Sequence, residues 1–171
     1  MKRPNPAEEA KEVLRLYGIT SAPVPVEAIA KHMGVDVRYA ALDDELSGMI
    51  FIKDGRPIIG INRLHHPNRQ RFTIAHELGH FVMHKKLITN EVHVDRQFRV
   101  LMRDGNAGSG TQKEEVEANR FAAALLMPEA LVLKAIADHT FDIDDENPLS
   151  ELAKQFKVSR QTMEYRVRNL A

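Results

Sequence analysis

The chain has 171 residues but no cysteine and no tryptophan, and its 24 lysines and arginines are balanced by 24 aspartates and glutamates. Without cysteine there is no disulfide and no thiolate metal site, so any metal must be held by histidine, aspartate or glutamate. The balanced charge gives no overall field that would attract nucleic acid or an anionic membrane. The sequence also lacks a membrane-spanning apolar run and the apolar core of a signal peptide. We therefore expect a cytoplasmic protein with no membrane partner.

Turn residues and hydrophobic periodicity divide the chain into helices, a small set of strands, and further helices. We expect helices over 5–17, 26–33, 67–86, 111–126, 128–138, 149–156 and 160–170, and strands over 35–39, 48–53, 57–61 and 98–102. Asp54-Gly55 indicates a hairpin, and 104–110 and 142–146 are typical of loops. This order predicts an α+β fold with a small, mainly antiparallel sheet. Residues 1–140 are expected to form the main domain, and residues 141–171 a helical extension packed on it.

The most informative segment lies inside the expected helix over 67–86. It reads His76-Glu77-Leu78-Gly79-His80, which is an H-E-x-x-H pattern. Residues four apart lie one turn apart on a helix, so the two imidazoles share a face and a carboxylate stands beside them. Zinc binds neutral ring nitrogens in this arrangement, and the carboxylate can serve as a base toward water. The alternative is a core helix with two satisfied histidines and a surface glutamate, but burying these polar groups without a metal is costly.

Catalytic zinc sites usually carry three protein ligands and one water, so the pattern requires a third ligand. One zincin subclass takes it from a later histidine, at a spacing that would need glycine and histidine where this chain has Met83 and Lys86. That subclass is therefore excluded. His84 follows the pair by one further turn, and we expect it to be a surface or helix-end residue.

The expected helix over 111–126 carries the best candidates for the third ligand. Glu114 suits a helix capping box, and Glu117 suits a surface ion pair. Glu115 instead shares a stripe with alanines and with Asn119, so this face can approach another helix closely. The pattern alone leaves Glu115 as either a metal ligand or a first-turn carboxylate that interacts with the helix dipole. Asn119, one turn further along, can hydrogen-bond a ligand histidine.

Two longer segments resemble the ImmA/IrrE-type zinc metallopeptidases: RFTIAHELGHFVMH at 71–84 and EVEANRFAAALLMP at 115–128. The resemblance implies a zincin-like main domain with a gluzincin-like ligand set. On the matching positions it makes His76, His80 and Glu115 the zinc ligands. It further implies an intracellular zinc endopeptidase whose protein substrate is a helix-turn-helix repressor, cut in a stress-response or mobile-element circuit.

This interpretation gives Glu77 a catalytic role. Glu77 lies about 100° around the helix from His76, so it flanks the metal rather than binding it. It would take a proton from water and later pass it to the leaving amine. A further donor should stabilise the oxyanion. The sequence does not choose among four candidates for that donor, namely Arg71, His93, Tyr39 and Tyr165.

The end of the chain looks like a helix-turn-helix, with Val158-Ser159 as its turn and N-cap. Residues 151–171 carry five lysines and arginines against two glutamates, a weak footprint for DNA, and Lys157 stands where such turns commonly have glycine. We therefore expect this tail to pack on the main domain rather than to bind nucleic acid. Two other functions stay open: a non-hydrolytic anti-repressor or toxin–antitoxin-type interaction protein that retains the zinc fold, and a DNA-binding regulator.

Overall fold

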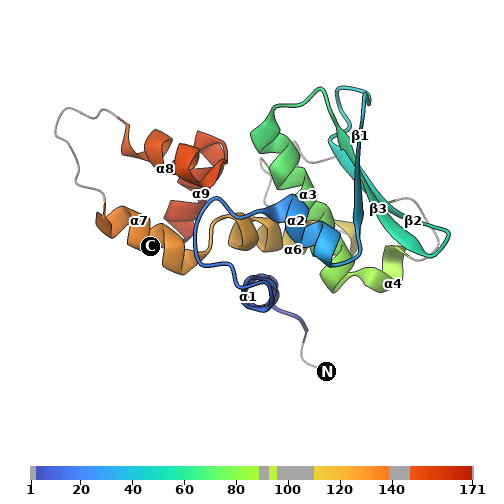
Figure 1. Ribbon diagram of the computed structural model, residues 1–171, viewed down its shortest axis with the longest axis horizontal. Coiled ribbons are helices and arrows are strands. Elements are labelled where there is room, and N and C mark those ends of the chain that lie inside the picture. The colour runs from blue at the N-terminus through green and yellow to red at the C-terminus, as the bar shows by residue number, and fades with distance from the viewer. Residues whose placement is uncertain (1–2, 89–92, 96–109, 139–146, 171) are drawn as a thin grey trace.

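The computed structural model describes residues 3–88, 93–95, 110–138 and 147–170, and it confirms the predicted α+β class. Figure 1 shows the sheet at one end of the molecule, the tail helices at the other, and the remaining helices between them. The helices are α1 (Pro6–Leu16), α2 (Val26–His32), α3 (Pro67–Met83), α4 (Lys85–Ile88), α6 (Gly110–Leu126), α7 (Glu129–Asp138), α8 (Pro148–Phe156) and α9 (Arg160–Leu170). The strands are β1 (Asp36–Ala40), β2 (Gly48–Lys53), β3 (Arg56–Asn62) and β4 (His93–Asp95).

The described strands form one mixed sheet in the order β1-β3-β2-β4. β2 pairs antiparallel with both β3 and β4, whereas β3 pairs parallel with β1. The predicted hairpin between β2 and β3 is confirmed, because its turn residues Asp54 and Gly55 have φ angles of 51° and 74°. Two successive positive φ angles are what a two-residue turn needs to match the twist of the strands, and Asp-Gly adopts them readily.

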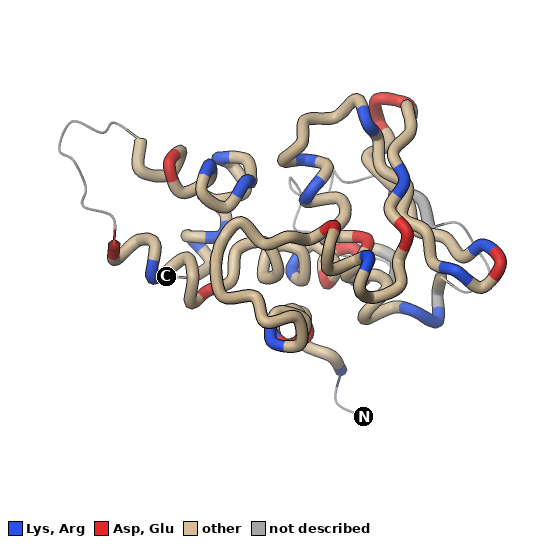
Figure 2. Tube along the Cα trace, viewed as in Figure 1, with Lys and Arg blue, Asp and Glu red and all other residues tan. Residues whose placement is uncertain are grey.

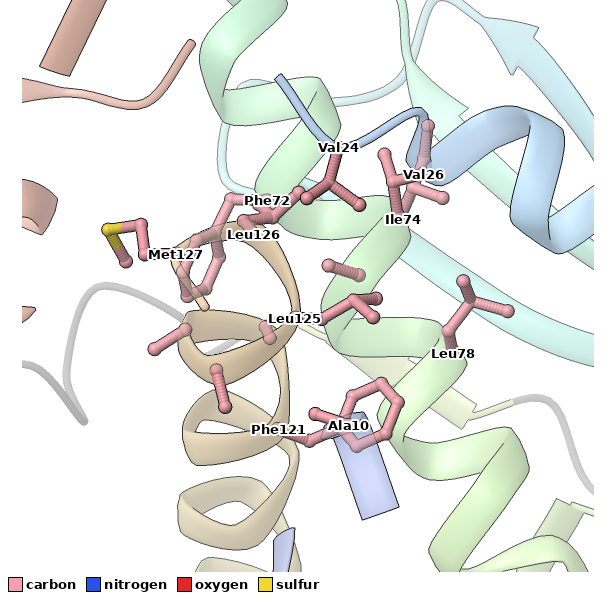
Figure 3. Packing of buried hydrophobic residues seen from close by; sticks show 14 of the residues in the cluster. Ala10, Val24, Val26, Phe72, Ile74, Leu78, Phe121, Leu125, Leu126 and Met127 are labelled. Carbon is pink, nitrogen blue, oxygen red and sulfur yellow. The ribbon is translucent and has the colours of Figure 1, made fainter. Parts of the chain in front are cut away.

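Helices α3 and α6 pack against each other in the middle of the molecule (Figures 1 and 3). Leu78 of α3 and Phe121 and Leu125 of α6 are fully buried there, and Figure 3 shows them with their neighbours. On its other side α3 covers β2 and β3, whose Ile50 and Ile59 are also fully buried. Each such side chain contributes roughly 1.5–3 kcal/mol through burial. Because both sides of α3 are covered, the polar residues in its middle are buried together with its apolar ones, namely Thr73, His76, Glu77 and His80.

The structure corrects the expected helix over 67–86. Helix α3 ends at Met83, where His84 forms its C-cap with φ −122° and ψ 27°, and a separate short helix α4 follows. The backbone N–H of His84 still donates to the His80 carbonyl at 2.8 Å, so the chain leaves the helix directly after this bond. The short strand β4 was not predicted. The strand expected over 98–102, all but the last residue of the loop over 104–110, and the acidic loop over 142–146 lie outside the described residues.

The C-terminal tail makes hydrogen bonds to α3, through the turn between α8 and α9, and to the residue just after α6, through α9. At the start of α3, the Asn68 side chain donates to the Val158 carbonyl at 3.3 Å, and Arg71 Nε donates to the Lys157 carbonyl at 3.3 Å. Just after α6, the Met127 carbonyl accepts from Arg166 Nε at 2.9 Å. These bonds place the tail against the main body. The division of the chain at residue 140 stays a prediction.

Two of the five basic residues of the tail form ion pairs, and the expected weakness of the tail as a DNA surface stays a prediction. Lys154 pairs with Glu151 at 2.9 Å and Arg168 with Glu164 at 2.5 Å, which leaves little uncompensated charge at these positions. Basic and acidic residues are mixed at both ends of the molecule (Figure 2). Separately, in the part of the chain that the structure describes, every helix is too short or too polar to cross a membrane.

Candidate metal centre

The close approach of α3 and α6 depends on small residues. A Cβ added at Gly79 of α3 would lie 3.1 Å from Phe121 Cδ1 and 3.2 Å from both Cα and O of Ala118. Ala118 and Ala122 on the facing helix are fully buried. The alanine stripe predicted from the sequence therefore does bring α6 close to the helix that carries the H-E-x-x-H pattern.

Replacing Gly79 with alanine tests this contact. Alanine is favoured over glycine within a helix by about 1 kcal/mol, whereas overpacking a tight interface costs roughly 1–3 kcal/mol. Two of the three close atoms belong to the backbone of α6 and cannot rotate away, so overpacking should win. We expect Gly79→Ala to lower the free energy of unfolding in urea by up to about 2 kcal/mol, and Gly79→Val to lower it further. A stabilised Gly79→Ala protein would show that the helices separate without cost.

The approach of the two helices brings His76, His80 and Glu115 to one point. His76 Nε2 lies 3.0 Å from Glu115 Oε2, His80 Nε2 lies 3.1 Å from Glu115 Oε1, and the two ring nitrogens lie 3.1 Å apart. Both histidines are buried, and the glutamate side chain is nearly so. This is the group of described residues whose nitrogen and oxygen atoms lie close enough together to hold one metal ion.

The chemistry of these atoms fits a divalent cation. His76 Nδ1 lies 2.9 Å from Asn119 Oδ1, and because a carbonyl oxygen only accepts, Nδ1 must carry the hydrogen. In a neutral ring Nε2 then presents a lone pair toward the glutamate. Ligands 2.0–2.1 Å from a tetrahedral zinc ion lie about 3.3 Å from one another, close to the separations of 3.0–3.1 Å found here. A cation at this point would satisfy all three groups.

Glu115 is ionised in this setting. Burial is the largest single influence and raises the pKa of its carboxyl group, but hydrogen bonds and charge from the adjacent His76 and His80 outweigh it and hold the pKa below its ordinary value. Without a cation, such a bond needs a hydrogen on Nε2 of the ring. A bound cation would take the place of that hydrogen and leave the Nε2 lone pair as its ligand. A carboxylate is the form that binds a metal. Glu77, between the two histidines in sequence, is fully buried in α3.

Two residues next to this cluster were missed in the sequence. The expected surface or helix-end residue His84 is indeed the end of α3, but its side chain is buried against His80, with their Nδ1 atoms 3.2 Å apart. Glu117, expected in a surface pair, accepts from His84 Nε2 at 3.0 Å. The four-residue spacing from His80 to His84 was a usable signal for the first contact. No sequence signal pointed to the second.

The four candidate oxyanion donors gain no support from the described contacts. Arg71 donates to the carbonyls of Val24 and Lys157, and its burial lowers the pKa of its guanidinium group. The Tyr39 hydroxyl donates to Glu27 at 2.7 Å, and burial together with this glutamate raises the pKa of Tyr39 to about 12. Tyr165 is exposed on α9. The side chain of His93 lies outside what the structure describes.

Comparison with known proteins gives consistent matches. The model of the IrrE N-terminal-like domain family matches residues 30–168. The radiation response metalloprotease IrrE of Deinococcus radiodurans is 31% identical over 112 residues, which are 63% of this chain and 30% of that protein. A solved structure of a Mycobacterium tuberculosis transcriptional regulator has a TM-score of 0.64 at 18% identity, over 95% of this chain and 46% of that one. This last likeness shows a shared fold alone, and the chain spans less than half the length of either relative.

Proposed function

The chain belongs to the IrrE N-terminal-like domain family, and from this premise we propose that it is a zinc-dependent endopeptidase with a zincin-like fold. Kinship with a metalloprotease already implies a metal ion. The observation that carries the more specific proposal is the convergence of His76, His80 and Glu115 within hydrogen-bonding distance of one another, beside the buried Glu77. A non-hydrolytic binding protein would need the fold but not this complete set of polar groups.

His76, His80 and Glu115 would hold the ion, and Asn119 would fix the ring of His76. Bound zinc supplies a Lewis acid for the substrate carbonyl and lowers the pKa of water toward about 7. The assignment leaves the proton transfers to the protein's own side chains.

Glu77 is the residue proposed to carry out those transfers. Its carboxylate would accept a proton from water as the water oxygen bonds to the carbonyl carbon of the scissile peptide. The same group would then give that proton to the amide nitrogen as the carbon–nitrogen bond breaks, which restores the carboxylate. Its complete burial in α3, between the two proposed histidine ligands in sequence, supports placing this carboxylate within the centre.

The proposed substrate is a protein in the cytoplasm, specifically a helix-turn-helix transcriptional repressor. The name of one relative supports a regulatory role, because it is a radiation response metalloprotease. This chain covers 30% of that protein, so a regulatory role enters here as part of the proposal.

The test is incubation of the purified protein with a helix-turn-helix repressor encoded beside its gene, with Zn²⁺ or with EDTA. We expect discrete fragments with Zn²⁺, none with EDTA, and their return when excess Zn²⁺ is added back. Mass spectrometry of the fragments would locate the cleaved bond. Tight binding of the repressor without fragments, with or without metal, would contradict hydrolysis and favour the anti-repressor function.

A further inference from the structure

The ring of His80 is held on the side that faces away from Glu115. Its Nε2 points toward Glu115 and His76, and its Nδ1 lies 3.2 Å from Nδ1 of His84. On the far side of His84, Nε2 lies 3.0 Å from Glu117 Oε2. Glu117 and Glu115 both come from α6, so this helix contacts His80 directly on one side and through His84 on the other.

Glu117 determines which nitrogen donates and which accepts in the two hydrogen bonds that link it to His84 and His84 to His80. An ionised carboxylate only accepts hydrogen bonds, so Nε2 of His84 must carry a hydrogen and donate it to Glu117. A neutral His84 ring then has a lone pair at Nδ1. The bond to His80 is formed only if His80 Nδ1 carries the hydrogen, which leaves the lone pair of His80 on Nε2. That atom is the one that faces Glu115.

The other histidine of the cluster has the same arrangement with a different partner. Nδ1 of His76 donates to Asn119 Oδ1 at 2.9 Å, so its lone pair is also on Nε2. The two rings stand nearly perpendicular, at 81°, and direct their Nε2 atoms to one point. Each ring therefore has its own acceptor at Nδ1, an amide oxygen for His76 and an imidazole for His80.

The surroundings of His84 keep it in place. Its backbone N–H is bonded to the His80 carbonyl at 2.8 Å, and only 9% of its side chain is exposed. Glu117 is 22% exposed, and Lys113 stands 3.9 Å from its other oxygen. A hydrogen bond buried to this degree holds its two partners in one geometry.

From this geometry we infer that His84 and Glu117 are positioning residues of the metal centre. The hydrogen bonds from Glu117 to His84 and from His84 to His80 fix the orientation and tautomer in which His80 presents Nε2 to the ion. The inference rests on the proposed function, since it takes His80 as a ligand. Partners of this kind typically change metal affinity roughly 10- to 100-fold when they are removed. In this inference neither residue is a ligand of the ion, and both act through His80.

The first experiment compares two substitutions of similar size at residue 84. His84→Asn places a carbonyl oxygen close to the position of Nδ1, whereas His84→Leu fills the same space with a methyl group that accepts nothing. Zinc affinity is measured by competition with a chromophoric chelator, which needs no substrate. We expect His84→Leu to weaken binding roughly 10- to 100-fold and His84→Asn to recover most of that loss.

The second experiment applies the same logic one bond further from the metal. Glu117→Gln keeps an oxygen that can accept from His84 Nε2, whereas Glu117→Leu does not. We expect weaker zinc binding in Glu117→Leu than in Glu117→Gln. In zinc-loaded protein with ¹⁵N-labelled histidine, the Nδ1–H proton of His80 should resonate downfield, and it should move upfield in His84→Leu but not in His84→Asn. Urea unfolding of each metal-free variant shows whether the fold is kept.

The outcomes separate this inference from the proposed function. If the unmodified protein binds no zinc, both are overturned. If it binds zinc and His84→Leu binds equally well, the positioning role is overturned and the metal site stands. If His84→Asn is as weak as His84→Leu while both are folded, the shape of the ring matters rather than its acceptor, and the hydrogen-bonded chain is overturned.

Discussion

Replacing Glu77 with glutamine is expected to lower kcat for cleavage of a protein substrate by roughly 10²–10⁴-fold, the contribution usual for a positioned acid–base group. Glutamine has nearly the same size as glutamate, but it cannot accept a proton from water. Because Glu77 is proposed as the base and not as a ligand, zinc affinity should stay within the range of the unmodified protein. Kinetics on a fluorogenic peptide taken from the cleaved repressor, together with the metal content of the same sample, measure both quantities.

Glu8→Gln is the control for this experiment, since it makes the same chemical change at an exposed position of α1. It should leave both kcat and metal content unchanged. Undiminished hydrolysis by Glu77→Gln would remove Glu77 from the proton transfers. Loss of zinc from that variant would instead assign Glu77 to the ligand set, and the mechanism would need a different base.

Replacing Glu115 with glutamine should remove most of the stability that zinc adds to the protein. A ligand present at 1,000 times its Kd stabilises a folded protein by about 4 kcal/mol, which raises the Tm of a chain of this size by roughly 8–16 °C. The neutral amide of glutamine is a poor substitute for a carboxylate as third ligand, so Glu115→Gln should show only a small part of this rise. Calorimetry with and without EDTA gives the difference directly.

The neighbouring Glu114→Gln is the matched control, because it changes the same side chain one residue away on α6. Its Tm should rise with zinc as much as that of the unmodified protein. A full zinc-dependent rise in Glu115→Gln would mean that the ion is held without this residue. The convergence of α3 and α6 would then have to serve another purpose.

The sequence was sufficient for those parts of the centre that depend on helical spacing. The one-turn separation of His76 and His80, and the stripe that links Glu115 to Asn119, both follow from a regular helix. The close approach of the helices was also readable, because the alanines on the stripe of α6 have little side chain to keep another helix away. These features are local, or are the sum of two local patterns.

The sequence could not predict the surroundings of His84. They depend on the residue at which α3 ends and on which side chains of other elements lie opposite that end. Extending α3 to residue 86 placed His84 about 80° around the helix from His76 and toward solvent. The helix ends at Met83 instead. His84 meets Glu117, 33 positions away in sequence, and no spacing rule connects the two. The parallel pairing of β1 with β3 was unreadable for a similar reason, since it depends on the path of the chain between the strands.

The hydrogen bonds of the tail have a practical consequence for anyone who wishes to shorten the protein. Arg71 and Asn68 are anchored to the tail at the beginning of α3, and Met127, just beyond the end of α6, accepts from Arg166. The tail thus braces the two helices that carry His76, His80 and Glu115, at points remote from those residues. A fragment cut at residue 140 would keep every one of them and still lose that brace. Metal affinities measured on such a fragment would describe a looser pair of helices than the full chain possesses.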